Sequence, residues 1–386
     1  MKKIRLGIER VFNEEKKVLR GSRVGIICNQ ASVDSNYRYS ADLFYFDDEI
    51  DLRAVFSPQH GFYSDVQDNM IESAHGRFRD LPLFSLYSET REPTDEMLAD
   101  IDVLVFDLQD VGCRVYTFIY TMANAMKACA RLGKRFVVLD RPNPIGGVAV
   151  EGNLLEPGHE SFVGMYEIPM RHGMTVGELA LLFNQHIGCE LYVVKLEGWQ
   201  RDSFYDELGI GWVMPSPNMP SIDTAIVYPG TVFFEGTKVS EGRGTTRPFE
   251  IVGAPYIDAE LLANEINKEG LDGVYFRPIW FIPTFQKHAN KVCGGVFLHV
   301  TDRKVFRPVL TGVALLKKIR ELYGEKFQWQ DPPYEYVFDR NPFDVIAGTF
   351  RLREAIETEA SISEIASLWK VDELKFIEFR KEYLIY

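Results

Sequence analysis

The chain has 386 residues, of which 46% are hydrophobic, and a formal net charge of −13 at pH 7. A chain of this length usually folds into two domains, because a single core rarely grows so large. The acidic balance argues against a nucleic-acid partner, since binding to a phosphate backbone depends on basic patches.

The N-terminal segment MKKIRLGIERVF carries two lysines, but no apolar core or small-residue cleavage site follows them. It therefore lacks the pattern of a secretory signal, and we expect a cytoplasmic protein. No stretch approaches the roughly 20 apolar residues of a membrane-spanning helix, so no membrane partner is expected. The sequence does not indicate an oligomeric state.

Short apolar segments alternate with amphipathic ones from residue 23 to 196. The expected strands are residues 24–28, 52–56, 83–86, 103–106, 136–139 and 191–196, and the expected helices lie around 39–46, 94–100, 118–132 and 175–187. Thr175 and Glu178 form a capping box for the last helix. This alternation predicts an α/β fold in which helices cover both faces of a doubly wound, mainly parallel sheet.

Prolines crowd residues 212–221, and we expect a domain boundary there, between residues 1–220 and 221–386. Beyond it the pattern predicts an apolar segment at 225–234, helices at 258–268 and 310–323, and strands at 274–276 and 295–300. Short charged helices are expected after residue 350. The second domain should therefore be smaller and of the α+β class.

Three of the expected strands end in polar residues. Gln59 and His60 follow the strand at 52–56, Asp107, Gln109, Asp110, Arg114 and Tyr116 follow the strand at 103–106, and Asp140, Arg141 and Asn143 follow the strand at 136–139. Open α/β sheets bind ligands beyond the carboxyl ends of their strands, so the three clusters predict one site at that edge. For any one cluster alone, a capped turn with solvated charges is the competing interpretation.

Metals and organic cofactors are not expected. The first strand is not followed by GxGxxG, and GxxxxGK[ST] does not occur in the chain, which argues against a nucleotide. The five cysteines are widely spaced and predict neither a zinc site nor a redox motif. Cys113 is a candidate nucleophile, but its sequence neighbours include no obvious base.

Several loop carboxylates suit the hydrolysis of a glycosidic bond, which needs a proton donor and a second group. They are Asp107, Asp110, Asp140, Glu235 and Glu241. His60 is either a substrate ligand or a satisfied structural histidine at a tight turn. The guanidinium groups of Arg243 and Arg247 suit a carboxylate ligand, with a solvated loop as the alternative.

The motifs SPQHGF, FDLQDVGCRVYTFIYTM, LDRPNPIGG and TAIVYPGTVFFEGTKVSEGRGTTRPFEIVGAP follow one another along the chain. With them the chain resembles the NamZ-type exo-β-N-acetylmuramidases, glycoside hydrolase family 171, over nearly its whole length. The resemblance implies a Rossmann-like first domain and an active site in the cleft beside a smaller second domain. It also implies release of N-acetylmuramic acid from the non-reducing ends of peptidoglycan fragments in cell-wall recycling.

One position departs from the family pattern, which has Pro-Glu-His-Gly with that glutamate as a proposed catalytic residue. This chain has Gln59 there, and a glutamine amide cannot exchange a proton as a carboxyl group does. Carried over by position, the resemblance implies Gln59, His60, Asp107 and Asp110 as catalytic candidates. Another carboxylate, such as Glu72, Asp65, Asp107 or Asp110, would have to take the role of the missing glutamate. The substrate-binding residues that it implies are Gln109, Arg114, Tyr116, Asp140, Arg141, Asn143, Asn218, Glu235, Glu241, Arg243 and Arg247.

Three functions are compatible with the sequence. The first is a hydrolase that acts on a muropeptide or another amino-sugar substrate. The second is a glycan-binding or sensor protein of the same family, impaired in catalysis by Gln59. The third is an α/β enzyme of another kind that shares only the fold, against which the missing phosphate-binding loop argues.

Overall fold

The computed structural model describes residues 4–67 and 70–386, and its larger sheet has seven strands. These are β1 (Arg23–Ile27), β2 (Asp51–Ser57), β3 (Gly76–Phe78), β4 (Leu81–Ser85), β5 (Val103–Phe106), β6 (Arg135–Leu139) and β9 (Glu190–Val194). They lie in the order β3-β4-β2-β1-β5-β6-β9, and every pair is parallel except β3–β4. The predicted doubly wound, mainly parallel sheet is confirmed. Its order reverses at β1, between β2 and β5.

Helices cover both faces of this sheet, as its apolar strands require. The helices of this part of the chain are α1 (Gly7–Asn13), α2 (Ser40–Tyr45), α3 (Phe118–Leu132) and α4 (Val176–Ile187), with the 3-10 turns η1 (Lys16–Val18) and η2 (Tyr205–Glu207). Alternate side chains of β5 enter opposite cores: Leu104 and Phe106 pack in one cluster, Val103 and Val105 in the other. The uninterrupted apolar run is thus explained by burial on both sides.

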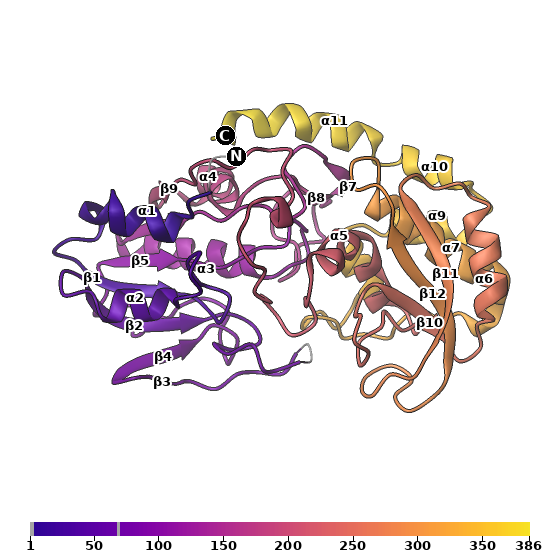
Figure 1. Cartoon of the computed structure of the whole chain (residues 1–386), viewed down its shortest axis with the longest axis horizontal. Coiled ribbons are helices and arrows are strands. Elements are labelled where there is room, and N and C mark those ends of the chain that lie inside the picture. Colours follow the sequence, from indigo (N-terminus) through magenta and orange to yellow (C-terminus); the bar gives the residue numbers. More distant parts are fainter. Residues whose placement is uncertain (1–3, 68–69) are drawn as a thin grey trace.

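The second part of the chain is smaller and of the α+β class, as predicted. Its antiparallel sheet has the order β10-β12-β11, from β10 (Ile251–Ala254), β11 (Val274–Phe281) and β12 (Cys293–Val300). Its helices are α5 (Ile222–Thr231), η3 (Val232–Gly236), α6 (Ala259–Asn267), α7 (Pro308–Tyr323), η4 (Gly324–Lys326), α8 (Pro342–Ala347), α9 (Arg351–Glu357), α10 (Ile362–Ser367), α11 (Lys370–Phe379) and η5 (Arg380–Tyr383). Figure 1 shows this part beside the larger sheet.

One predicted helix is wrong. Residues 94–100 form consecutive turns. Their backbone hydrogen bonds join residues three or four positions apart, such as Ala99 N–H to Glu96 O (3.3 Å) and Leu98 N–H to Thr94 O (3.2 Å). These bonds do not extend into the continuous series from residue i to residue i−4 that defines an α-helix. The sequence pattern also missed the short strand pair β7 (Glu151–Leu154) and β8 (Pro169–Arg171), and β10.

Helices α5 and α7 cross at a pair of glycines. A methyl group on Gly312 would lie 2.1 Å from the carbonyl oxygen of Gly230, and one on Gly230 would lie 1.8 Å from that of Pro308. Only glycine allows so close an approach of two backbones. The crossing fixes the end of α5, and with it the turn η3 that follows.

The end of the chain returns to the first part. Helix α11 runs along the molecule and brings the C-terminus close to the N-terminal side (Figure 1). Arg380 donates to the carbonyl oxygens of Gly147 (2.9 Å) and Val148 (2.9 Å), and the Tyr386 hydroxyl donates to Asp140 (2.6 Å). The boundary at residue 220 therefore stays a prediction, because the tail packs on the other side of it.

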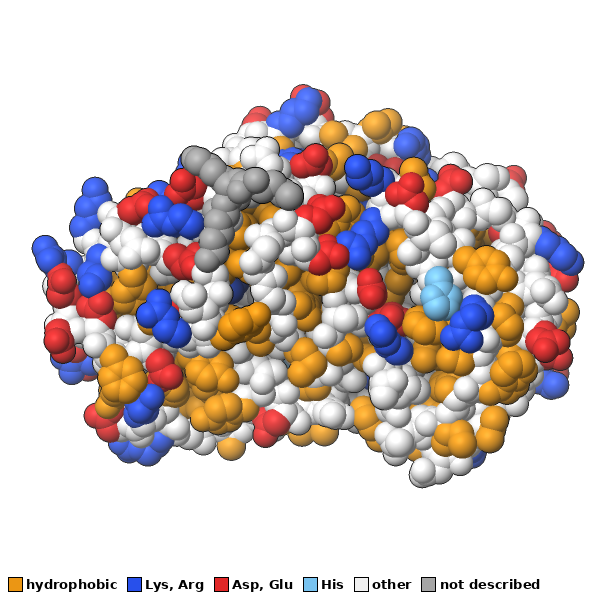
Figure 2. All heavy atoms as spheres, viewed as in Figure 1, with side chains coloured by type: hydrophobic (Ala, Val, Ile, Leu, Met, Phe, Trp, Pro, Cys, Tyr) orange, Lys and Arg blue, Asp and Glu red, His pale blue; other side chains and the backbone are white. Residues whose placement is uncertain are grey.

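Acidic and basic side chains are mixed over the face of the molecule in Figure 2. Within the described residues, no helix has the length and the apolar character needed to cross a membrane.

Arg114 is a buried charge that joins the two parts of the chain. Its guanidinium donates to Asn153 O (2.8 Å) and Ile168 O (3.0 Å), and to Ile346 O (3.3 Å) and Ala347 O (2.6 Å). The last two carbonyls end α8, where helix carbonyls lack partners and the helix dipole favours a cation. Burial lowers the pKa of Arg114, and the carbonyl oxygens offset the loss of water around its charge.

We predict that Arg114→Leu destabilises the fold by roughly 3 kcal/mol or more, because four buried carbonyl oxygens lose their donor. Urea unfolding would show this as a lower midpoint. Arg20→Leu is the matched control, since the Arg20 side chain is 70% exposed. Equal midpoints for the two variants would contradict the structural role of Arg114.

Candidate active site

A small pocket lies where loops from both parts of the chain meet. It encloses about 40 Å³ and is lined by Gln59, His60, Val115, Tyr116, Thr117, Phe118, Val163, Ser216, Asn218, Met219, Tyr228, Glu235, Arg243, Phe249, Tyr334 and Glu335. Ligand pockets usually measure roughly 300–1,000 Å³, so a ligand larger than a few waters requires the loops to separate. A hollow of about 780 Å³ between α1 and residues 34–47 contains none of the predicted site residues among the described residues that line it.

The first wall of the pocket is a chain of hydrogen bonds through Gln59. The turn after β2 places Gln59 beside the start of α3, where the Thr117 hydroxyl donates to Gln59 Oε1 (2.7 Å). Gln59 Nε2 in turn donates to Glu335 Oε1 (3.2 Å), and the Tyr87 hydroxyl donates to Glu335 Oε2 (2.8 Å). Burial raises the pKa of Glu335, and the charge of Glu235 acts in the same direction.

Another part of the pocket wall holds a second glutamate, whose partner is a cation. Glu235, on η3, pairs through Oε1 with Arg243 Nη2 (2.5 Å) and accepts a hydrogen bond from the Tyr334 hydroxyl at Oε2 (2.6 Å). Behind it, Glu241 pairs with Lys287 (2.8 Å). Burial alone would raise the pKa of Glu241, but Lys287 and Arg243 lower it overall. The cations and carboxylates of this wall thus alternate.

His60 follows Gln59 in the turn after β2 and also lines the pocket. Its backbone is left-handed, with a φ of +72°. Its Nδ1 is 2.7 Å from the carbonyl oxygen of Val66, which fixes Nδ1 as the protonated nitrogen of the neutral ring. Burial lowers the pKa of His60 to about 4. The ring is therefore neutral near pH 7 and presents its Nε2 as an acceptor.

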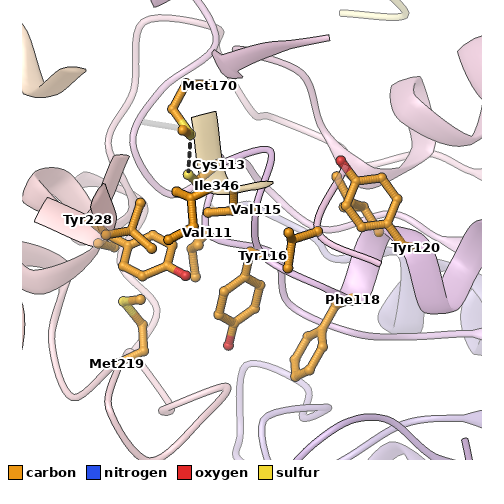
Figure 3. Packing of buried hydrophobic residues seen from close by; sticks show 14 of the residues in the cluster. Val111, Cys113, Val115, Tyr116, Phe118, Tyr120, Met170, Met219, Tyr228 and Ile346 are labelled. Carbon is orange, nitrogen blue, oxygen red and sulfur yellow. Dashed lines mark hydrogen bonds between the residues drawn. The ribbon is translucent and has the colours of Figure 1, made fainter. Parts of the chain in front are cut away.

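Aromatic side chains line the remainder of the pocket. Tyr116 and Tyr228 meet edge to face with ring centroids 6.1 Å apart. Figure 3 shows both side chains together with Phe118 and Met219, which also line the pocket. The Cys113 side chain is buried away from the pocket lining, with its Sγ 3.6 Å from the sulfur of Met170, and burial raises the pKa of the thiol, which argues against a nucleophile. The dashed line in Figure 3 marks that contact.

The structure brings together some of the predicted site residues and separates others. Those that line the pocket are Gln59, His60, Tyr116, Asn218, Glu235 and Arg243. Those that lie elsewhere are Glu72, Asp107, Gln109, Asp110, Arg114, Asp140, Arg141, Asn143, Glu241 and Arg247. The residues in the second group have partners of their own.

The crevice where the strand order reverses is filled by a buried ion pair. Arg141 Nε lies 2.6 Å from Asp107 Oδ1, and its Nη2 donates to Asp107 Oδ2 (2.8 Å) and to Val33 O (3.0 Å). The Ser40 hydroxyl also donates to Asp107. A carboxylate so enclosed has no face left for a ligand.

The other predicted residues at this edge of the sheet form hydrogen bonds that hold the loops in place. Asp110 accepts from Gly112 N–H (2.7 Å) and lies 3.4 Å from His172 Nε2. Asp140 accepts from the backbone and from the hydroxyls of Thr175 (2.8 Å) and Tyr386 (2.6 Å). Gln109 donates to the carbonyl oxygens of Asp110 and Pro142, and Asn143 to that of Met174.

Two further predicted residues lie near the surface. The Glu72 side chain is 54% exposed, 3.9 Å from Arg91, and the Arg247 side chain is 45% exposed, 3.3 Å from Glu250. Both terminal nitrogens of Arg114 donate to the carbonyl oxygens described above. Among the three arginines suited to a ligand carboxylate, Arg243 is therefore the one that lines the pocket.

Five further residues line the pocket without having been predicted from the sequence: Thr117, Ser216, Tyr228, Tyr334 and Glu335. Glu335 stands in PPYEYVF, a segment without a strand exit or motif to single it out. Within residues 4–67 and 70–386, no three His, Cys, Asp or Glu side chains gather in a way that would hold a metal ion. Two glutamates with different partners on one pocket suit proton transfer.

Comparison with known proteins covers the whole chain. Residues 24–223 match the family described as exo-beta-N-acetylmuramidase NamZ, N-terminal, and residues 226–386 match its C-terminal counterpart. Peptidoglycan beta-N-acetylmuramidase NamZ of Bacillus subtilis (strain 168) is 44% identical over 387 residues, which cover 100% of this chain and 92% of that protein.

Two solved structures share the fold, both of DUF1343 family proteins from Bacteroides fragilis NCTC 9343. One has a TM-score of 0.89 and 35% identity, covering 100% of this chain and 99% of its own. The other has a TM-score of 0.78 and 29% identity, covering 99% of each chain. Since the family match and the Bacillus relative span both halves of the sequence, this chain belongs to the NamZ family of exo-β-N-acetylmuramidases.

Proposed function

We propose that this chain is an exo-acting β-N-acetylmuramidase that releases N-acetylmuramic acid from the non-reducing ends of peptidoglycan fragments, in cell-wall recycling. The observation that carries the proposal is the placement of Glu235 and Glu335 on one pocket, with different partners. Glycosidases act with two such carboxyl groups on either side of the scissile bond. The Bacillus subtilis relative acts on peptidoglycan, which supports a muropeptide substrate.

The pocket lies between the two halves of the chain, whose boundary we propose at residues 220/221. Ser221 caps the start of α5, and the two family matches end and begin at residues 223 and 226, which supports this division. Because the pocket encloses only about 40 Å³, entry of a sugar requires loops that line it to move. The cytoplasmic location stays a prediction.

A glycan-binding protein without turnover is the second candidate, and Gln59 is the observation that favours it. The amide of Gln59 cannot donate or accept a proton in catalysis, and its hydrogen bonds to Thr117 and Glu335 give it a structural task instead. The remaining possibility, an unrelated α/β enzyme, is removed by membership of the family.

We predict that the purified chain releases 4-nitrophenol from 4-nitrophenyl β-N-acetylmuramic acid and not from the matching N-acetylglucosaminide. The two substrates differ in the lactyl carboxylate of the muramic sugar, for which Arg243 is the cation in the pocket. Absorbance of the released phenol measures both rates. Equal rates on the two substrates would contradict muramic specificity, and no release from either would contradict the hydrolase.

We also predict that Gln59→Glu brings no gain in turnover, because the pocket already contains Glu235 and Glu335. Rates of the variant and the wild type on the muramic substrate are compared side by side. An inactive wild type together with an active Gln59→Glu variant would instead identify a binding protein that lost its catalytic carboxyl group.

A further inference from the structure

We propose that Glu335 is the general acid of this site, and that Tyr87 and Gln59 are the residues that position it. This inference rests on the proposed glycosidase function and assigns one of its two carboxyl groups. Glu335 is 4% exposed, lines the pocket, and is contributed by the second part of the chain, whereas both positioning residues belong to the first. The acid is therefore held in place only when the two parts are docked.

The contacts of Glu335 are those of a proton donor and not those of a fixed charge. Its two oxygens meet neutral groups, the Gln59 amide at 3.2 Å and the Tyr87 hydroxyl at 2.8 Å. A tyrosine hydroxyl both donates and accepts, so it can serve the protonated and the ionised carboxyl group alike. Glu335 can thus change its protonation state without leaving a buried polar atom unsatisfied at that oxygen.

Burial favours the protonated form of Glu335. Removal from water raises the pKa of the carboxyl group, and the nearby charge of Glu235 raises it further. The hydrogen bonds from Tyr87 and Gln59 oppose this shift, as does the positive charge of Arg91. A carboxyl group that keeps its proton closer to neutral pH is suited to protonate a leaving group.

Glu235 is the contrasting member of the pair. Its carboxylate lies 2.5 Å from the guanidinium of Arg243, whereas the hydrogen-bond partners of Glu335 are neutral groups. The two glutamates therefore differ in their partners in the way that divides an acid from a nucleophile or base.

The backbone around Glu335 supports a functional role. Glu335 and Tyr336 both adopt left-handed conformations, with φ of +43° and +64°. This region is energetically unfavourable for residues other than glycine. The segment adopts this unfavourable conformation, and in it the Glu335 carboxyl group contacts Gln59 and Tyr87.

In the reaction, the bond between the anomeric carbon of the muramic sugar and the bridging oxygen breaks as Glu335 gives its proton to that oxygen. A water supplies the hydroxyl group that the anomeric carbon gains. The second proton of this water returns Glu335 to its acid form. One water is consumed, two sugars with free hydroxyl groups are formed, and the enzyme is unchanged.

The test compares leaving groups for the wild type and Glu335→Gln. A sugar hydroxyl leaves poorly without a proton, whereas 4-nitrophenol leaves readily as an anion. We expect Glu335→Gln to lower kcat/KM about 10²–10⁴-fold on the disaccharide N-acetylmuramyl-β-1,4-N-acetylglucosamine. The loss on the 4-nitrophenyl substrate should be far smaller. The basic limb of the pH profile, which reports the ionisation of Glu335, should disappear in the variant.

Two further variants keep the result interpretable. Glu190→Gln, at a side chain that is 71% exposed on β9, is the control and should leave both rates unchanged. Tyr87→Phe removes a hydrogen bond that lowers the pKa of Glu335, so it should move the basic limb to higher pH. This shift can be measured even if Glu335→Gln fails to fold.

Equal losses on both substrates with an unaltered pH profile would overturn the role of Glu335 while leaving the proposed hydrolase intact. An unmoved basic limb in Tyr87→Phe would overturn it as well. A wild type that cleaves neither substrate would overturn the hydrolase itself, and with it the assignment of an acid.

Discussion

Four carbonyl oxygens from the two halves of the chain converge on the buried guanidinium of Arg114. This contact ties the loop after β5 to the end of α8 at Ala347, twelve residues beyond Glu335. The candidate site depends on that docking, because Gln59 and Thr117 come from one half and Glu235 and Glu335 from the other. A pocket assembled in this way exists only when both halves are folded and joined.

Much of the fold could be predicted because its signals are local. The apolar run Val103–Phe106, the capping box at Thr175 and the glycine after α3 each specify an element from neighbouring residues alone. Predictions failed where local signals are weak or shared, as in the turns at 94–100 and the short strands β7 and β8. Their structure is decided by packing against distant segments.

The site was harder to predict, because polar residues that follow a strand can either bind a ligand or pair with one another. Asp107 and Arg141 stand where α/β sheets commonly bind ligands, yet they pair with each other and close that crevice. The pocket lies further along the loops, where Gln59 and Glu235 were recognised through their motifs. Glu335 was missed because its importance comes from contacts with residues 276 and 248 positions away in the chain, Gln59 and Tyr87.

The central claim is that sugar binds between the two halves of the chain, at Glu235 and Glu335. A crystal structure of the protein with N-acetylmuramic acid tests this most directly. Our account predicts the sugar in this pocket, with its anomeric oxygen within hydrogen-bonding distance of the Glu335 carboxyl group. A sugar bound instead at the carboxyl edge of β1 and β5, beside Asp107 and Arg141, would contradict it.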